Sequence, residues 1–196
     1  MAASVRIAVQ GADRVGLVAV VTGCLFSFGL DLGDTTFGVL GAGFEFAAVA
    51  ECPSGVSAAQ VEAELRLLPD LADCQVTVRN FAFNAPPGDR GGGTHRICIR
   101  GGDQPGLIAR LSEAFIEFGA NIVRMSSERV RDSGDDLYVT EFEVAIPAER
   151  APAWLAAVAS TAEQLHQVCV SETLWPDALG VCLRRLPWRG AEARRA

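Results

Sequence analysis

Residues that could build a catalytic or metal centre are scarce in this chain. Its 196 residues include only two histidines, His95 and His166, and neither has a metal-ligand neighbour at useful spacing. None of its six cysteines belongs to a Cys-x-x-Cys pair. We therefore expect no metal and no cofactor, and we interpret the cysteines as small buried hydrophobic residues rather than as disulfides.

Long apolar runs and excess positive charge are also lacking. No stretch approaches the ~20 uninterrupted apolar residues of a membrane span, and the N-terminal residues have no signal-peptide layout. The net charge of −7 disfavours binding to nucleic acid or to anionic membranes, because both rest on positive fields. We therefore expect a cytoplasmic protein that contacts no membrane and does not bind nucleic acid directly.

What the chain does contain is an internal repeat at an offset of 90 residues. The segment 9–17, VQGADRVGL, returns as 99–107, IRGGDQPGL, and residues 28–29 and 118–119 are both Phe-Gly in the same register. A chain that repeats a strand–turn–helix unit consists of copies of one small module. The 49% hydrophobic content is enough for two cores.

Hydrophobic periodicity predicts the order β-α-β-β-α-β in each copy. The elements expected in the first copy are a strand at 5–9, a helix at 17–28, strands at 30–40 and 43–52, a helix after Ser57 and a strand at 74–78. Those expected in the second copy are strands at 94–100, 120–131, 137–147 and 166–173, helices at 107–118 and 151–163, and a longer hairpin loop at 131–136. This order defines an α+β, ferredoxin-like fold, with an antiparallel sheet and helices on one face.

Composition divides the chain into four segments. We expect a first domain at 1–83, a Pro/Gly linker at 84–93, a second domain at 94–174 and a basic C-terminal tail at 175–196. From residue 176 on, the tail carries five arginines against one Asp and one Glu, a net charge of +3. It could dock within the protein's own dimer, or contact a protein partner or nucleic acid.

The strand-to-helix turns are the candidate binding sites. Helix N-termini expose backbone N–H groups and bind carboxylates. Asp13 and Asp103 stand three residues before Gly16 and Gly106, where each could accept hydrogen bonds from an ammonium group. A donor-rich helix end beside a carboxylate complements a free amino acid. The alternative is that each Asp only caps its turn.

Both turns resemble the opening of an ACT domain, and residues 119–122 resemble that family's step from first helix to second strand. The resemblance covers about residues 4–80 and 94–173. It implies ferredoxin-like regulatory modules that bind amino acids at interfaces between paired domains. The layout of two such modules without a catalytic domain is similar to the glycine cleavage system transcriptional repressor group.

The resemblance implies ligand contacts at both turns and at the start of each second strand. In the second copy these residues are Asp103, Gln104, Pro105, Gly106, Leu107, Asn121 and Ile122. In the first copy they are Asp13, Arg14, Val15, Gly16, Leu17 and Asp31. Because Asp31 stands where the second copy has Asn121, it would repel a ligand carboxylate but could hold an amine. We therefore expect the second copy to be the more typical site.

These features predict a non-catalytic regulatory protein, a homodimer, that binds an amino acid and modulates a protein partner. The alternative is a ligand-free interaction module that uses its sheet faces and its basic tail. An acylphosphatase-type hydrolase on the same fold would need an arginine in the turn. Arg14 meets that need, but Gln104 replaces it in the second copy and no matching catalytic asparagine follows it in the first.

Overall fold

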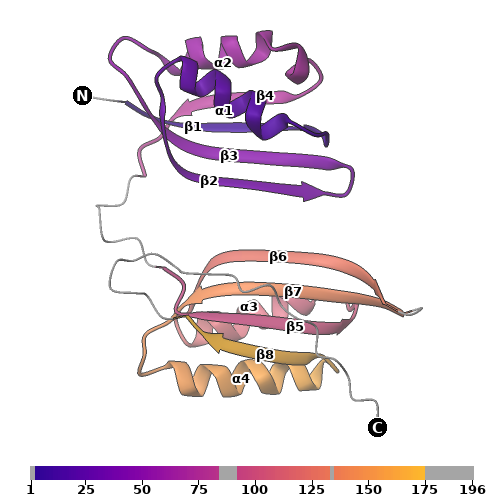
Figure 1. Cartoon of the computed structure of the whole chain (residues 1–196). Coiled ribbons are helices and arrows are strands. Elements are labelled where there is room, and N and C mark those ends of the chain that lie inside the picture. The colour runs from indigo at the N-terminus through magenta and orange to yellow at the C-terminus, as the bar shows by residue number, and fades with distance from the viewer. Residues whose placement is uncertain (1–2, 84–91, 133–134, 175–196) are drawn as a thin grey trace. The chain divides into compact units, whose positions relative to one another are not determined.

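The computed structural model describes residues 3–83, 92–132 and 135–174, and it divides the chain into unit 1 (residues 1–86) and unit 2 (residues 87–196) (Figure 1). Unit 1 contains β1 (Ala3–Ala12), α1 (Leu17–Ser27), β2 (Asp31–Leu40), β3 (Gly43–Cys52), α2 (Ala58–Leu67), a 3-10 turn (Pro69–Leu71) and β4 (Gln75–Asn80). Unit 2 contains β5 (His95–Gly102), α3 (Leu107–Glu117), β6 (Asn121–Asp132), β7 (Asp135–Ala145), α4 (Ala151–Gln164) and β8 (Val168–Thr173).

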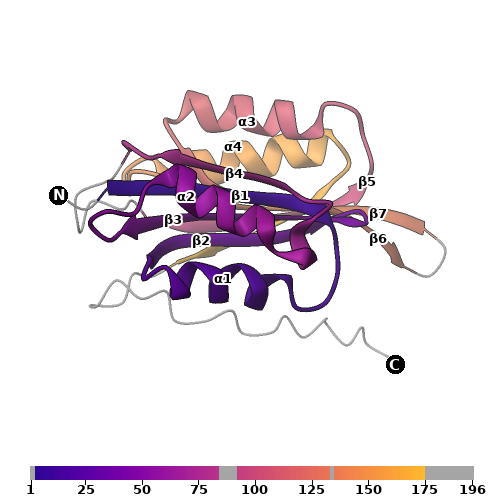
Figure 2. The same ribbon diagram turned by 90° about the horizontal axis from the view of Figure 1, so that it is seen from above.

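Each unit contains one antiparallel sheet. The strand order is β2-β3-β1-β4 in unit 1 and β6-β7-β5-β8 in unit 2. Helices α1 and α2 run side by side on one face of the first sheet, and α3 and α4 lie on one face of the second (Figures 1 and 2). The predicted α+β, ferredoxin-like fold is therefore confirmed for both units.

The cores lie between each sheet and its helices. In unit 1, Val5, Ile7 and Val9 of β1 alternate inward and are at most 1% exposed, as expected for a strand with one covered face. In unit 2 the core contains Trp154 of α4, whose ring contacts those of Phe115 and His95. Both cores therefore form from the period-2 and period-3.6 patterns that the sequence predicts.

Helix boundaries follow local backbone chemistry. Gly29 and Gly119, which follow α1 and α3, have φ values of +70° and +66°, so the predicted left-handed glycines after these helices are confirmed. Ser57 begins α2 with a capping box: its hydroxyl accepts from the backbone N–H of Gln60, and the Gln60 side chain accepts from the N–H of Ser57.

Three details differ from the predicted elements. The hairpin loop predicted at 131–136 is wrong at its ends, because β6 continues through Asp132 and β7 begins at Asp135. The last strands begin later than predicted, at Gln75 and Val168. The residues just before them are used differently: Cys74 packs against Gly11, and Gln167 packs against Gly101.

Several predictions fall on residues outside the described ranges. These are the linker at 84–91, Cys182 and the tail at 175–196. Within the described part of the chain, all five cysteines are free thiols. The same part contains no helix long and apolar enough to cross a membrane, and no group of three His, Cys, Asp or Glu residues placed to hold a metal ion.

Candidate functional site

The turn between β1 and α1 is fixed by backbone contacts. Gly16 begins the helix in the left-handed region, with φ of +95°. The N–H of Asp13 donates to the carbonyl of Ala42 at 2.9 Å, which ties the turn to the β2–β3 hairpin. The side chains of Asp13, Arg14 and Val15 are exposed. The turn therefore presents an exposed carboxylate and a helix N-terminus on the surface.

The turn between β5 and α3 has the same backbone but different side-chain contacts. Gly106 has φ of +83°, and the N–H of Leu107 donates to the carbonyl of Gln104 at 3.2 Å. The carboxylate of Asp103 accepts a hydrogen bond from the Arg129 guanidinium of β6 at 2.6 Å. In unit 1 the residue at the position of Arg129 is Val39, which cannot form this ion pair.

Neither Asp13 nor Asp103 caps its helix. Among the residues that the structure describes, no side chain accepts a hydrogen bond from the first turn of α1 or α3. A Cβ added at Gly16 or Gly106 would meet no described atom within 4 Å, so the space above both helix starts is open. The glycines are required by their positive φ. The capping alternative is therefore wrong for both turns.

The remaining predicted turn residues divide by burial. Pro105 is exposed and Gln104 is half-buried. Leu17 and Leu107 are each 2% exposed and belong to the cores of their units. Their side chains hold the helix starts in place and do not line the surface of the turns.

The residues predicted on the second strands lie far from the turns of their own units. Gly102, just before Asp103, pairs with Leu137 of β7, whereas Asn121 pairs with Ala145. Eight residues along a strand span about 27 Å. The same separation holds in unit 1, where the β1 end of the turn pairs with the start of β3 and Asp31 pairs with its far end.

Asn121 and Asp31 are exposed, whereas Ile122 packs against the core of unit 2. Within one unit, the structure therefore does not bring the second-strand residues to the turn.

An apolar surface lies beside the first turn. We call it the α1–β2 surface; its exposed members are Val15, Val18, Phe26, Phe37 and Val39. Both elements lie toward the edge of unit 1 opposite β4 (Figure 2). Where α1 has Val20 and Gly23, α3 has the exposed, charged Arg110 and Glu113. A helix that is apolar all round usually has a covered outer face, so α1 is the helix that indicates a partner.

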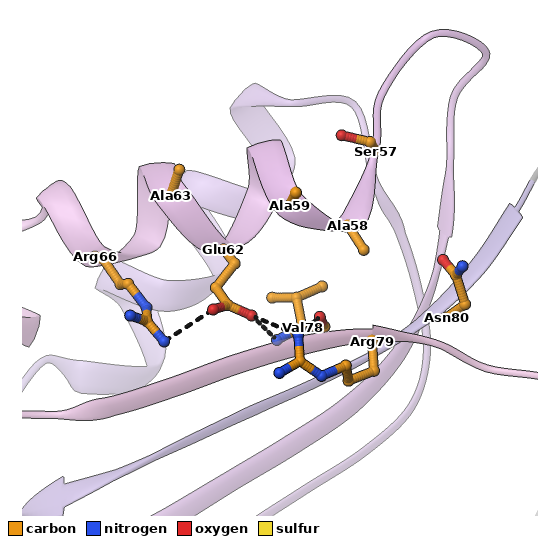
Figure 3. A pocket seen from close by; sticks show the side chains of 9 residues that line it. All are labelled: Ser57, Ala58, Ala59, Glu62, Ala63, Arg66, Val78, Arg79 and Asn80. Carbon is orange, nitrogen blue, oxygen red and sulfur yellow. Dashed lines mark hydrogen bonds and ion pairs between the residues drawn. The ribbon is translucent and has the colours of Figure 1, made fainter.

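A separate hollow lies between α2 and β4 (Figure 3). It has a volume of about 580 Å³. The carboxylate of Glu62 accepts from the N–H of Val78 at 2.8 Å and lies 2.8 Å from Arg66 and 3.5 Å from Arg79. The N–H of Val78, and then Arg66 and Arg79, hold the pKa of Glu62 below its usual value. A carboxylate held charged in this way suits an edge contact rather than proton transfer near neutral pH.

Sequence reasoning missed Arg129 and Glu62. The repeat offset could have revealed Arg129, because residue 39 of the first copy is Val and residue 129 is Arg. It could not reveal the contact with Asp103, which joins residues 26 positions apart on different elements. Glu62 lies in no recognisable motif. Its contact with the backbone of β4 can be understood only once the sheet shows that β4 is an edge strand.

Both units have the fold of ferredoxin-like, ACT-type domains. Residues 5–79, nearly all of the described part of unit 1, match the sequence model of the ACT domain family. This match lies within unit 1, and unit 2 repeats the topology of unit 1 with the same strand order.

Solved structures support the fold along most of the chain. An unknown protein from Galdieria sulphuraria is 19% identical, with a TM-score of 0.70 over 89% of this chain and 100% of that one. The protein named "putative glycine cleavage system transcriptional repressor" is 12% identical, with a TM-score of 0.60 over 88% of this chain and 97% of that one. At these identities the likeness is one of fold. No curated protein sequence matches the chain.

Proposed function

We propose that this chain is a non-catalytic regulatory protein that binds a free amino acid at its strand-to-helix turns and so modulates a protein partner. The observation that carries the proposal is the pair of uncapped helix starts, at Gly16 and Gly106, each with an exposed aspartate three residues earlier. The family match of unit 1 supports it. Cytoplasmic location and the absence of a cofactor are part of the same proposal.

The chemistry of the first turn fits a zwitterion. The N–H groups at the start of α1 suit a carboxylate, and the exposed carboxylate of Asp13 suits an ammonium group. In the second turn, Asp103 is already paired with Arg129. An amine could reach Asp103 only by displacing that guanidinium, which would then be free to hold the carboxylate of the ligand.

Completion of the site requires a second module. Asp31 and Asn121 lie at the far ends of their sheets from the turns. A second ACT-type module placed in the opposite direction would bring its own second strand to the turn. The exposed α1–β2 surface supports such pairing, because large apolar patches mark interaction sites. We therefore propose a homodimer, with the amino acid bound between modules.

Regulation then follows from linkage. An amino acid that bridges two modules favours the arrangement in which both contact it, and this shift cannot exceed its differential affinity for the two arrangements. A partner that binds one arrangement better would respond to the concentration of the ligand. The glycine cleavage system relative suggests transcriptional regulation of amino-acid metabolism as one output.

The test is a thermal-shift screen of the full chain against the twenty amino acids at millimolar concentration. Ligand at 100 times its Kd should add about 2.7 kcal/mol to stability. We expect one or two amino acids to raise Tm, and Asp13→Ala and Asp103→Ala to reduce that shift. Asp70→Ala, in the 3-10 turn of unit 1, is the matched control and should keep the full shift.

A screen without any shift would contradict the proposal and favour the ligand-free interaction module, which the α1–β2 surface also supports. Retention of the full shift by both Asp13→Ala and Asp103→Ala would show that the amino acid binds elsewhere.

A further inference from the structure

The outer edge of β4 in unit 1 is blocked by side chains of α2. The N–H of Val78 donates to Glu62 (Figure 3), and Arg66 donates to the carbonyl of Val76 at 2.9 Å. The backbone groups of these two β4 residues therefore point away from β1, and helix side chains occupy both. Natural proteins protect edge strands from unwanted pairing in this way.

The corresponding backbone groups of β8 in unit 2 can be identified from the register. Val76 pairs with Val9, and Cys169 pairs with Ile99, which is the same position of the repeat. Just beyond the two strands, the backbone N–H of Phe81 donates to the carbonyl of Ser4 in β1, and that of Leu174 donates to the carbonyl of Thr94, directly before β5. Cys169, and with it Ser171, therefore points its N–H and C=O groups outward, because outward and inward residues alternate along a strand.

The blocking residues of α2 have no polar equivalents on α4. When the buried Val158 of α4 is matched with Leu65 of α2, Leu155 and Ala159 fall at the positions of Glu62 and Arg66. Neither side chain can form a hydrogen bond. Among the described residues of α4, no side chain bonds the outward backbone groups of β8.

The side chains along this edge are apolar as well. Val168 and Val170 of β8 are 63% and 55% exposed. Unit 1 has Gln75 and Thr77 at these positions, 93 residues earlier. The same side of the repeated fold is thus polar and blocked in unit 1, and apolar and open among the described residues of unit 2. Repeated folds that differ in this way at one edge indicate that the open edge is used.

We propose that β8 pairs antiparallel with β8 of a second copy of this chain, around a two-fold axis at Val170. In this register Cys169 exchanges both backbone hydrogen bonds with the partner's Ser171, and Ser171 does the same with the partner's Cys169. The two Val170 side chains face each other. Leu155 and Ala159 extend the contact along the helix layer.

The strand's charge pattern and symmetry favour a copy of itself as the occupant. The charged side chain of β8, Glu172, is paired with Arg96 of β5. Pairing of β8 with a second β8 therefore places no unpaired like charges opposite each other. Antiparallel pairing of identical strands covers both open edges at once and closes the assembly as a dimer. This pairing does not depend on the binding of an amino acid.

The first test introduces the edge-blocking side chains of unit 1, Glu62 and Arg66, at the equivalent positions of unit 2. Leu155→Glu combined with Ala159→Arg should weaken the dimer in sedimentation velocity without added amino acid, with the circular dichroism spectrum unchanged. Ala156→Glu combined with Ser160→Arg is the matched control: the pair has the same spacing on α4, rotated away by about 100°. The control should remain a dimer. A dimer whose affinity is unchanged by Leu155→Glu with Ala159→Arg would overturn the proposal.

The second test addresses the two-fold axis. Val170→Lys and Val170→Glu each place like charges opposite each other and should weaken the dimer several-fold, whereas a 1:1 mixture of the two variants should restore it. Amide exchange of Ser171 should be slow in the dimer and fast after dilution. A wild-type chain that is monomeric at all concentrations, or a mixture that fails to associate better than either variant, would refute the pairing.

Discussion

Gly16 and Gly23 lie seven residues apart in the α1 region, yet only the backbone conformation of Gly16 requires a glycine. Gly16 has φ of +95°, whereas Gly23 lies within the helix, and an added Cβ would meet no described atom within 4 Å at either position. We expect Gly16→Ala to lower the free energy of unfolding by about 1–2 kcal/mol, the cost of a left-handed L-residue. Gly23→Ala should raise it by about 0.5–1 kcal/mol. Urea unfolding followed by circular dichroism measures both, and equal effects would contradict the turn geometry.

His95 makes the stability of unit 2 dependent on pH. Burial lowers the pKa of His95 below its ordinary value of 6.5. Because the unfolded chain binds the proton more readily, the stability from neutral His95 is complete above pH ~6.5 and decreases below it. We expect the urea midpoint to fall between pH 7 and 5, and His95→Phe to remove this slope. A slope that persists in His95→Phe would contradict the assignment.

At the scale of elements, Glu62 links α2 to the edge of β4. The pKa of Glu62 is lower in the folded chain than its ordinary value of about 4.5. The charged carboxylate therefore stabilises the fold at pH values above 4.5, and this stability is lost as the pH falls through the pKa of the folded state. We expect NMR titration to show Glu62 protonating below the ordinary glutamate pKa of about 4.5. Arg66→Ala should move the pKa of Glu62 upward, toward its usual value. A Glu62 that titrates at its ordinary pKa would contradict the contact with Val78.

The elements themselves could largely be predicted from the sequence. The repeat at 90 residues places Leu107 and Gly119 where Leu17 and Gly29 stand, so one interpretation of the pattern applies to both units. Strand ends were less predictable: Cys74 fits an alternating apolar pattern, yet it lies just before β4 begins. Hydrophobic periodicity does not show where hydrogen-bonded pairing starts.

The candidate sites could be predicted only in part. The turn motif locates Asp13 and Asp103, because spacing along the chain fixes the helix starts. The pairing of Asp103 with Arg129, and of Glu62 with Val78, depends on which residues share a sheet edge or a hairpin end. Sequence spacing alone does not contain that information. The separation of about 27 Å between turn and second strand likewise follows from the register of the hairpins.

At the scale of the whole molecule, the two units differ in acid sensitivity. His95, which loses stability below pH ~6.5, lies in unit 2. Glu62, which protonates only at lower pH, lies in unit 1. We therefore expect acidification from pH 7 to 5 to weaken unit 2 relative to unit 1. Native-state hydrogen exchange can measure this with Ile7 and Ile97, which are equivalent core residues fully buried in β1 and β5. The difference between their exchange free energies should grow as pH falls; a constant difference would contradict the prediction.

The position of Trp154 in the core of unit 2 has an optical consequence. Its ring is fully buried, and the chain's other tryptophans, Trp175 and Trp188, and its one tyrosine, Tyr138, also belong to the second half of the sequence. Because unit 1 contains neither residue type, it emits almost no light when excited at about 295 nm or about 275 nm, where indole and phenol rings absorb. Direct contact of a ligand with the residues of unit 1 alone therefore changes no indole or phenol emission of that unit, and a tryptophan introduced into unit 1 would make binding there visible.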